Sequence, residues 1–488
     1  MATAAVQVVT TSNAAGEVRI SGVVSGAGAF TKAGPGILTL SGVNTNSGLA
    51  TLNAGTLNLS SAAALGTSTA ADGLKINGGT LYNSSGGTLT TSVAKRQTWA
   101  GDFTFIGSND LSFNGGQATV TGTPRTVTVS AGKMSVGALT MVAAGTFIKA
   151  GAGTLSQTGG GLNTAPLNIA AGTFQMGDTD FNCSDMSGAG VFEKSTGTAK
   201  WFLLTQNGDT TFSGVMRDGP VAGSKVGLRK FGLGQLILSG AVAHTSSDSF
   251  LLENGVIKLT AGSFTVGQAA STRDASIGAN ASTSTSLLVA GGDFISTGQT
   301  FIGKGAVNAY NSLSVSSGSV TSGSWLVVGR NSDRSILNQS GGTINVTANR
   351  MTIGAGGSAS IGLANFSGGA FNNSAGIFVG ENSNGTLNVS GSATVNVGNA
   401  QFAGNATSTV GNLNLLGGSL NTGSITKGTS AAVSDYRFNF NGGTLKPTAN
   451  NATFFADLAL TTANVYSGGV VLDDRRTQPG ARWYPMSP

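Results

Sequence analysis

The sequence predicts an all-β solenoid in which short parallel strands stack turn upon turn. An apolar run that ends in glycine returns at a nearly fixed interval, because the glycines at 303, 329, 354, 380 and 404 are separated by 26, 25, 26 and 24 residues. Apolar and polar residues alternate within runs of four or five, as they do in half-buried strands. Helical periodicity is not sustained over any long stretch. Together these observations favour stacked strands over helical repeats.

A second phrase lies between these glycines and has the same period. It begins at Leu313, Leu337, Ala364, Leu387 and Leu413, and each copy runs into Ser-Gly, Gly-Gly or a similar turn signal. A turn of about 25 residues holds two or three short strands, and successive turns stack about 4.8 Å apart. The chain then holds at most about 19 such turns. A β-sandwich array would also explain the alternation, but it does not produce this period.

Composition limits the alternatives. The chain has 77 glycines in 488 residues, which is typical of disordered linkers, yet 39% of its residues are hydrophobic and these occupy repeated positions. Only 9% are charged, and the net charge of +6 comes from 26 basic and 20 acidic residues without a block of like charge. We therefore expect no nucleic-acid partner.

The regularity of the repeat changes along the sequence and divides it into three parts. Residues 1–260 carry degenerate strand repeats, residues 261–472 carry the regular repeat, and residues 473–488 form a non-repeat tail that we expect to be disordered. No signal peptide is visible at the N-terminus, and no run of 18 apolar residues predicts a membrane span. The abrupt tail favours a fragment of a larger protein.

The N-terminal part follows the same strand-and-turn pattern with looser spacing. Residues 26–59 contain four short alternating runs bounded by Gly, Asn or Ser-Gly, at 29–32, 37–40, 49–52 and 56–59. Three looser copies of this phrase follow. They lie at residues 145–176, 188–194 and 227–259.

Residues 26–59 resemble the autotransporter-associated β-strand repeat, which characterises the passenger regions of secreted bacterial proteins. Residues 300–470 resemble the Gly-Gly-Thr-Leu-rich region of large surface proteins of Gram-negative bacteria. The resemblance implies a right-handed parallel β-helix, export, and an extracellular or outer-surface location. It also implies the role of an adhesin or structural passenger, with polysaccharide, extracellular matrix or another cell surface as the partner.

Asp178, Asp180 and Asp185 form the acidic cluster of the repeat body. Parallel β-helices also include polysaccharide lyases and hydrolases, which use paired carboxylates, or calcium with a basic residue. These three residues, with Asn182, are therefore weak candidates for a metal or catalytic site. A solvated turn explains them as well, and the spacing lacks the glycine and distal glutamate of an EF-hand loop. We expect no catalytic residue, no metal and no cofactor.

Histidine and cysteine, two residue types that often take part in catalysis or metal binding, each occur once in the chain. His244 lies in a polar stretch and is interpreted as a turn residue, and Cys183 lacks a second thiol or a nearby histidine. Four lysines, Lys32, Lys149, Lys194 and Lys230, occupy equivalent places in the N-terminal copies. We interpret them as exposed charges that prevent strand edges from pairing, with attraction of acidic glycans as the alternative.

The sequence thus favours a non-catalytic, exported β-solenoid with a structural or adhesive role. A carbohydrate-active β-helix enzyme is the alternative.

Overall fold

The computed structural model shows an all-β parallel solenoid of about 18 turns, which confirms the fold class predicted from the sequence. The structure describes the following residues: 7–69, 73–142, 144–162, 165–268, 272–279, 284–304, 310–331, 334–356, 360–402, 410–428, 435–455 and 462–473. Within these ranges no helix occurs, and therefore no helical segment long and apolar enough to span a membrane. The tail beyond residue 473 and the repeat residue Gly404 lie outside the described residues.

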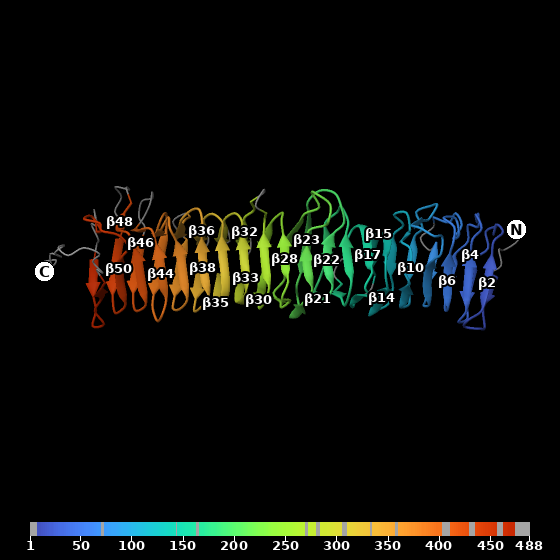
Figure 1. Ribbon diagram of the computed structural model, residues 1–488, viewed down its shortest axis with the longest axis horizontal. Helices are drawn as coiled ribbons and strands as arrows, with labels where there is room; N and C mark the ends of the chain where they lie inside the picture. Colours follow the sequence, from blue (N-terminus) through green and yellow to red (C-terminus); the bar gives the residue numbers. More distant parts are fainter. Residues whose placement is uncertain are drawn as a thin grey trace. The chain divides into compact units, whose positions relative to one another are not determined.

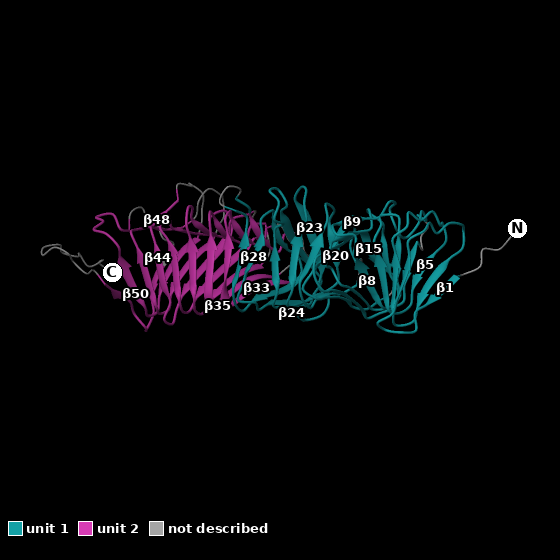
Figure 2. Ribbon diagram, turned by 45° about the vertical axis from the view of Figure 1, so that its right-hand side comes forward, with its two compact units in different colours: residues 1–273 teal, residues 274–488 magenta. Residues whose placement is uncertain are grey.

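The chain divides into two compact units, residues 1–273 and 274–488 (Figure 2). Within each unit the strands of neighbouring turns lie side by side in parallel ladders (Figure 1). In unit 2, which contains the regular repeat, each complete turn contributes one strand to each of three sheets.

Three lists give the strands of unit 2. Sheet 1 consists of the first halves of β33 (Thr285–Ser296) and β35 (Tyr310–Ser322), then β37 (Arg334–Gln339), β40 (Ile361–Phe366), β43 (Asn384–Val389), β46 (Val410–Leu415), β49 (Asp435–Phe440) and β51 (Thr462–Val465). Sheet 2 consists of the second halves of β33 and β35, then β38 (Thr343–Val346), β41 (Ala370–Asn373), β44 (Thr394–Val397), β47 (Ser419–Thr422), β50 (Thr444–Pro447) and β52 (Val471–Leu472). Sheet 3 consists of β32 (Ala275–Ile277), β34 (Thr300–Ile302), β36 (Leu326–Val328), β39 (Met351–Ile353), β42 (Ile377–Val379), β45 (Ala400–Phe402) and β48 (Ile425–Lys427).

The core of unit 2 consists of ladders of inward side chains. In sheet 1 the register stacks one position of each turn directly on the same position of the next, and every member of this ladder is fully buried. The ladder runs Leu313, Leu337, Ala364, Leu387, Leu413, Phe438. Apolar burial at every level supplies the main driving force for stacking. These are the positions that open the second repeated phrase of the sequence.

The repeated glycines have a conformational reason. Gly303, Gly329, Gly354 and Gly380 each end a strand of sheet 3 with φ between 73° and 78°, which is left-handed backbone that an L side chain adopts only with strain. The amide of each of these glycines donates a hydrogen bond to a carbonyl of the preceding turn, as in the 2.8 Å bond from Gly380 N to the carbonyl of Ile353. The period of about 25 residues therefore marks one corner of the solenoid.

Unit 1 also consists of stacked parallel strands, but its sheets do not all begin and end in the same turn of the solenoid. Sheet 4 consists of β1 (Gln7–Thr10), β3 (Phe30–Ala33), β5 (Ala50–Leu52), β7 (Leu74–Ile76), β10 (Gln97–Trp99), β13 (Ala118–Val120) and the second half of β15 (Lys133–Met141). Sheet 5 consists of β2 (Glu17–Ile20), β4 (Ile37–Leu40), β6 (Thr56–Leu59), β8 (Thr80–Asn83), β11 (Phe103–Phe105), β14 (Arg125–Val129), β16 (Phe147–Ala150), β18 (Leu167–Ile169), β21 (Met186–Gly188), β24 (Thr210–Phe212), β27 (Gln235–Leu238) and β30 (Gly255–Leu259).

The remaining strands of unit 1 complete its turns. Sheet 6 consists of β9 (Leu89–Thr90), β12 (Leu111–Ser112), the first half of β15, β17 (Thr154–Gly159), β19 (Thr173–Met176), β22 (Val191–Lys194) and β25 (Val215–Arg217), and β28 (Ala243–Ser246) pairs with β31 (Ser263–Val266). Sheet 7 consists of β20 (Phe181–Cys183), β23 (Lys200–Thr205), β26 (Val226–Phe231) and β29 (Phe250–Leu252). The paired positions Phe174 and Phe192 are 18 residues apart, whereas Phe202 and Leu228 are 26 apart, so turn length varies.

Candidate functional site

The lysines of the N-terminal copies lie inside the solenoid. Lys32, Lys149, Lys194 and Lys230 are 0% exposed, so the prediction that they are exposed charges was wrong, for edge protection and for glycan attraction alike. The reason is that main-chain carbonyls of the lysine's own turn and of a neighbouring turn converge on each ammonium, joined at Lys194 by the carboxylate of Asp178. A charge buried with a full set of acceptors is tolerated, whereas an unpaired one is not.

Lys149 shows the geometry of this arrangement. Its Nζ donates to the carbonyls of Ala150 (3.0 Å), Gly151 (2.8 Å) and Ala171 (2.9 Å). The first two carbonyls belong to its own turn and the third to the next turn, 22 residues later. Lys32 repeats this pattern with Ala33, Gly34 and Ala54. Each ammonium therefore joins two consecutive turns from within.

A fifth buried lysine was missed from the sequence because it lies outside the recognised copies. Lys95 is 0% exposed, and its Nζ donates to the carbonyls of Leu65 (2.9 Å), Gly66 (3.2 Å) and Ser68 (2.8 Å). Burial lowers the pKa of Lys95 from 10.5 to about 8. No local motif marks it, because its acceptors lie 27 to 30 residues away along the chain.

The acidic cluster lies on the outside of unit 1, around β20. Asp178 accepts hydrogen bonds from Nζ of Lys194 (3.2 Å) and from the amide of Thr198 (3.0 Å). The hydrogen bond from Lys194 is the main cause that lowers the pKa of Asp178. Asp180 accepts one from the amide of Trp201 (2.9 Å). Both carboxylates thus bond to the main chain of the following turn.

Asp185 has the same type of partner. Its Oδ1 accepts hydrogen bonds from the amides of Asn207 (3.1 Å) and Gly208 (2.8 Å), and its Oδ2 accepts one from Ser184 (2.9 Å). Among the described residues, no group of three or more His, Cys, Asp or Glu side chains is arranged to hold a metal ion. The three acids of the cluster therefore connect consecutive turns in this structure.

His244 does not lie in a turn, which corrects the interpretation from the sequence. It is the second residue of β28 and is 0% exposed, between the rings of Phe212 and Phe264 at centroid distances of 6.2 and 6.4 Å. Its Nδ1 accepts a hydrogen bond from the amide of Met216 (3.2 Å). An accepting ring nitrogen requires the neutral imidazole, and burial lowers the pKa of His244 from 6.5 to about 4.

Cys183 faces the core from β20 and is fully buried. Burial raises the pKa of its thiol, chiefly by desolvation of the thiolate. A protonated, enclosed thiol behaves as a small apolar side chain.

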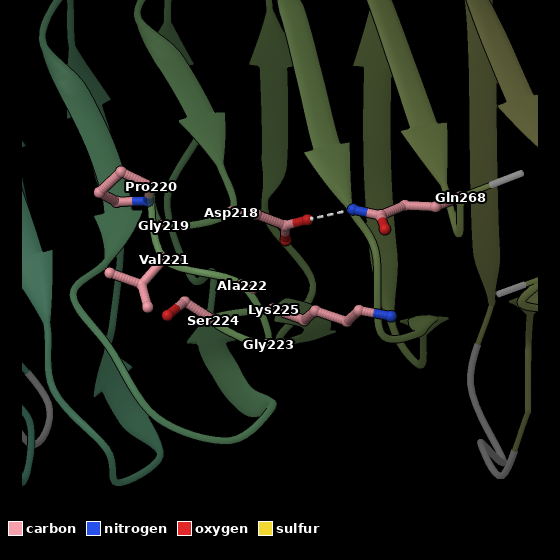
Figure 3. Close-up of a pocket in the computed structure, with 9 residues that line it drawn as sticks. All are labelled: Asp218, Gly219, Pro220, Val221, Ala222, Gly223, Ser224, Lys225 and Gln268. Carbon is pink, nitrogen blue, oxygen red and sulfur yellow. Dashed lines mark hydrogen bonds between the residues drawn. The ribbon is translucent and has the colours of Figure 1, made fainter. Parts of the chain in front are cut away.

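A cavity of about 410 Å³ lies beside a loop of unit 1 (Figure 3). The residues that line it are Asp218, Gly219, Pro220, Val221, Ala222, Gly223, Ser224, Lys225 and Gln268. Asp218 accepts hydrogen bonds from Nε2 of Gln268 (3.0 Å) and from the amide of Val226 (2.9 Å), so its carboxylate holds the loop. Lys225 and Ser224 also line the cavity, and the Ser224 hydroxyl is buried. Nothing in the sequence singled out this loop.

Sheet 3 of unit 2 has three consecutive strands, β34, β36 and β39, whose outward residues are buried. Phe301, Val327 and Thr352 occupy the middle of three consecutive strands and are 1%, 3% and 0% exposed. The repeated tripeptides at these positions were predicted as strands, but the covering of both faces was not.

Comparison with known protein families gives a match in the first of the N-terminal copies. Residues 30–59 match the family model of the passenger-associated-transport-repeat. This match confirms the resemblance to passenger repeats predicted for residues 26–59. No curated protein and no solved structure shows a significant match to the chain.

The matched passenger repeat spans β3 to β6, and it contains the first buried lysine. Lys32 lies in β3, and the carbonyl of Ala54, which it reaches at 2.9 Å, lies in the turn before β6. The repeat therefore carries its own link between two turns. With the solenoid fold, the match fits an autotransporter passenger-like protein with an extracellular or surface location.

Proposed function

We propose that the chain is a non-catalytic, exported β-solenoid with a structural or adhesive role on the outer surface of a Gram-negative bacterium. The observation that carries the proposal is the passenger repeat at residues 30–59 within a parallel solenoid. A stack of turns held by main-chain ladders presents a long surface with repeated shallow contacts. Such contacts gain strength by multivalency instead of from one deep pocket.

The surface chemistry supports this role. Charged residues make up only 9% of the chain, and the outer strand faces carry Asn, Thr and Ser in large number. Polar uncharged faces keep an exported solenoid soluble without strong repulsion between neighbouring molecules. Polysaccharide, extracellular matrix or a neighbouring cell surface are the partners that we propose for such a face.

Two measurements test this proposal. Protease treatment and antibody labelling of intact source cells are expected to reach the protein, whereas an intracellular control protein stays protected. Purified protein is expected to bind intact cells or a matrix polymer without releasing new reducing ends or unsaturated sugars. Product release that is lost in Asp178→Asn or Asp185→Asn would replace the proposal with a carbohydrate-active enzyme, and protection from protease would contradict export.

A further inference from the structure

Two groups of cation–ring contacts lie along sheet 3, one around Phe301 and one around Arg350. We call these six residues the cation–aromatic strip: Phe301, Lys304, Trp325, Arg330, Arg350 and Phe378. They come from four consecutive turns of unit 2, so the strip spans roughly three intervals of about 4.8 Å. Each cation lies against at least one aromatic ring, which is a favourable electrostatic contact.

One end of the strip is exposed and positively charged. Nζ of Lys304 lies 4.5 Å from the centroid of the Phe301 ring, and Cζ of Arg330 lies 5.4 Å from the same centroid. Both side chains are exposed, and among the described residues no carboxylate lies within 4.0 Å of either. The amide of Arg330 donates to the carbonyl of Gly303 at 2.9 Å, which places the two cations at the same corner in consecutive turns.

The other end is held rigidly. Cζ of Arg350 lies 4.4 Å from the Trp325 centroid and 3.9 Å from the Phe378 centroid, so the guanidinium contacts rings from two different turns. It also pairs with Glu381 at 2.6 Å, a carboxylate that is itself buried. Trp325 and Phe378 keep part of their surface exposed. Fixed rings and a fixed cation make a preorganised surface, which lowers the entropic cost of binding.

The charge balance indicates what this surface attracts. Between residues 299 and 381 the sequence has four cations, Lys304, Arg330, Arg334 and Arg350, against two carboxylates, Asp333 and Glu381, which gives 4 − 2 = +2. Arg334 stacks on Tyr310 one strand away, with Cζ 5.0 Å from the ring centroid. This part of the weakly charged chain therefore favours an anionic partner that also offers apolar ring faces.

We propose that the cation–aromatic strip binds an acidic polysaccharide, with Lys304 and Arg330 pairing with carboxylates on successive sugars and Trp325 contacting a sugar ring. The two cations are one turn apart, and that spacing is similar to the length of one sugar in an extended chain. Guanidinium groups match carboxylates geometrically, and aromatic rings match the apolar face of a pyranose. A nucleic acid fits less well, because the cations already cover the Phe301 ring and two exposed charges make a weak phosphate track.

This inference rests on the proposed surface role and deepens it by naming a ligand class. Binding by the purified 488-residue chain tests it separately from export. Binding to polygalacturonate is measured against fully methyl-esterified polygalacturonate, which is the same polymer without charge, and against single-stranded DNA. We expect binding to the acid form only, weakening as salt rises. Equal binding to the ester, tighter binding to DNA, or no binding to the acid form would overturn the inference, whereas the surface role would fail only in the cell-labelling test.

Matched variants localise the binding. Lys304→Gln/Arg330→Gln is expected to weaken binding to polygalacturonate about tenfold, because it removes both exposed cations of the strip. The control Arg19→Gln/Lys258→Gln removes two outward cations of unit 1 and is expected to change binding less than about twofold. Equal thermal unfolding of both variants shows that the fold is retained. Wild-type affinity in the strip variant, or equal losses in both, would also overturn the inference.

Discussion

The two units join their turns in different ways. In unit 1, buried lysines such as Lys149 connect consecutive turns from the inside. In unit 2, asparagine side chains connect them from the outside. Two ladders of hydrogen bonds between asparagine side chains run along sheets 1 and 2. The donor–acceptor distance of each bond lies between 2.6 and 2.9 Å. Their members are Asn338, Asn365, Asn388, Asn414, Asn439 and Asn464 in sheet 1, and Asn345, Asn372, Asn396 and Asn421 in sheet 2.

The difference follows from the regularity of the turns. An amide ladder needs the same residue at the same register in every turn, and unit 2 supplies it. In unit 1 the stacked residues differ, as where Thr39 lies beside Asn58 and Asn58 beside Tyr82. A lysine needs no identical neighbour, because main-chain carbonyls are present at every turn. Irregular turns can therefore be joined by a cation and regular turns by a ladder.

The largest effect is expected from removing a buried ammonium. Lys149→Met leaves three carbonyls without their donor and should lower the free energy of unfolding by about 3–5 kcal/mol at pH 7. Burial lowers the pKa of Lys149 to about 8, so the side chain is mainly charged at that pH. Urea titration measures the change. The control Lys225→Met, at a partly exposed lysine in a loop, should cost less than about 0.5 kcal/mol, and a similar small loss for Lys149→Met would contradict the role of the ammonium.

A smaller effect, again in unit 1, depends on pH. The pKa of His244 is about 4 in the folded protein and 6.5 in an exposed histidine, so the unfolded chain binds the proton more tightly. Stability is expected to be constant above pH 6.5, to fall by about 3 kcal/mol between pH 6.5 and 4, and to level off below pH 4. In His244→Asn the side-chain oxygen keeps an acceptor for Met216 without titrating. The difference between the two urea-stability profiles isolates His244, and a pH-independent difference would refute this prediction.

In unit 2 the prediction concerns the asparagine ladder of sheet 1. Asn388 donates to Asn365 at 2.7 Å and accepts from Asn414 at 2.6 Å, so Asn388→Ala breaks two links and should cost about 1–2 kcal/mol. Asn464 makes one ladder bond, to Asn439 at 2.8 Å, and Asn464→Ala should cost about half as much. Hydrogen exchange of the flanking amides measures both. Equal losses at the two positions would show that the ladder does not act link by link.

The smallest effect is expected at the acidic cluster. Asp185→Asn keeps an oxygen acceptor for the amides of Asn207 and Gly208 and should change stability by less than about 0.5 kcal/mol. Asp185→Ala removes that acceptor and should cost about 1 kcal/mol. Thermal unfolding of the pair measures the difference. A large loss in the Asn variant would mean that the negative charge itself matters.

Several features of the fold were predictable because they are local and repeated. Alternation predicted strands at residues 29–32 and 37–40, and the structure has β3 at Phe30–Ala33 and β4 at Ile37–Leu40. The spacing of the repeated glycines predicted turns of about 25 residues. The asparagine ladders lie on the outward faces of strands. The pleat decides this, because alternate residues of a strand face outward and Asn338 is one of them.

The candidate sites were less predictable. His244 has polar neighbours in the sequence, yet it lies between two phenylalanine rings from other turns. The cation–aromatic strip combines residues from four turns, spread between Phe301 and Phe378, and no local motif marks them. Its one local sign is that Phe301-Ile302 and Val327-Val328 place apolar residues on both faces of a strand, which indicates a covered outer face.

The sequence by itself determined the repeat, the parallel stacking and the apolar inward ladders, because a period and an alternation express the geometry of one turn. Only the tertiary structure decided which polar side chains enter the core. A lysine is buried where the carbonyls of its own turn and of the next converge on its ammonium, as at Lys32 and Lys149. That convergence depends on the register between turns, which no local stretch of sequence contains.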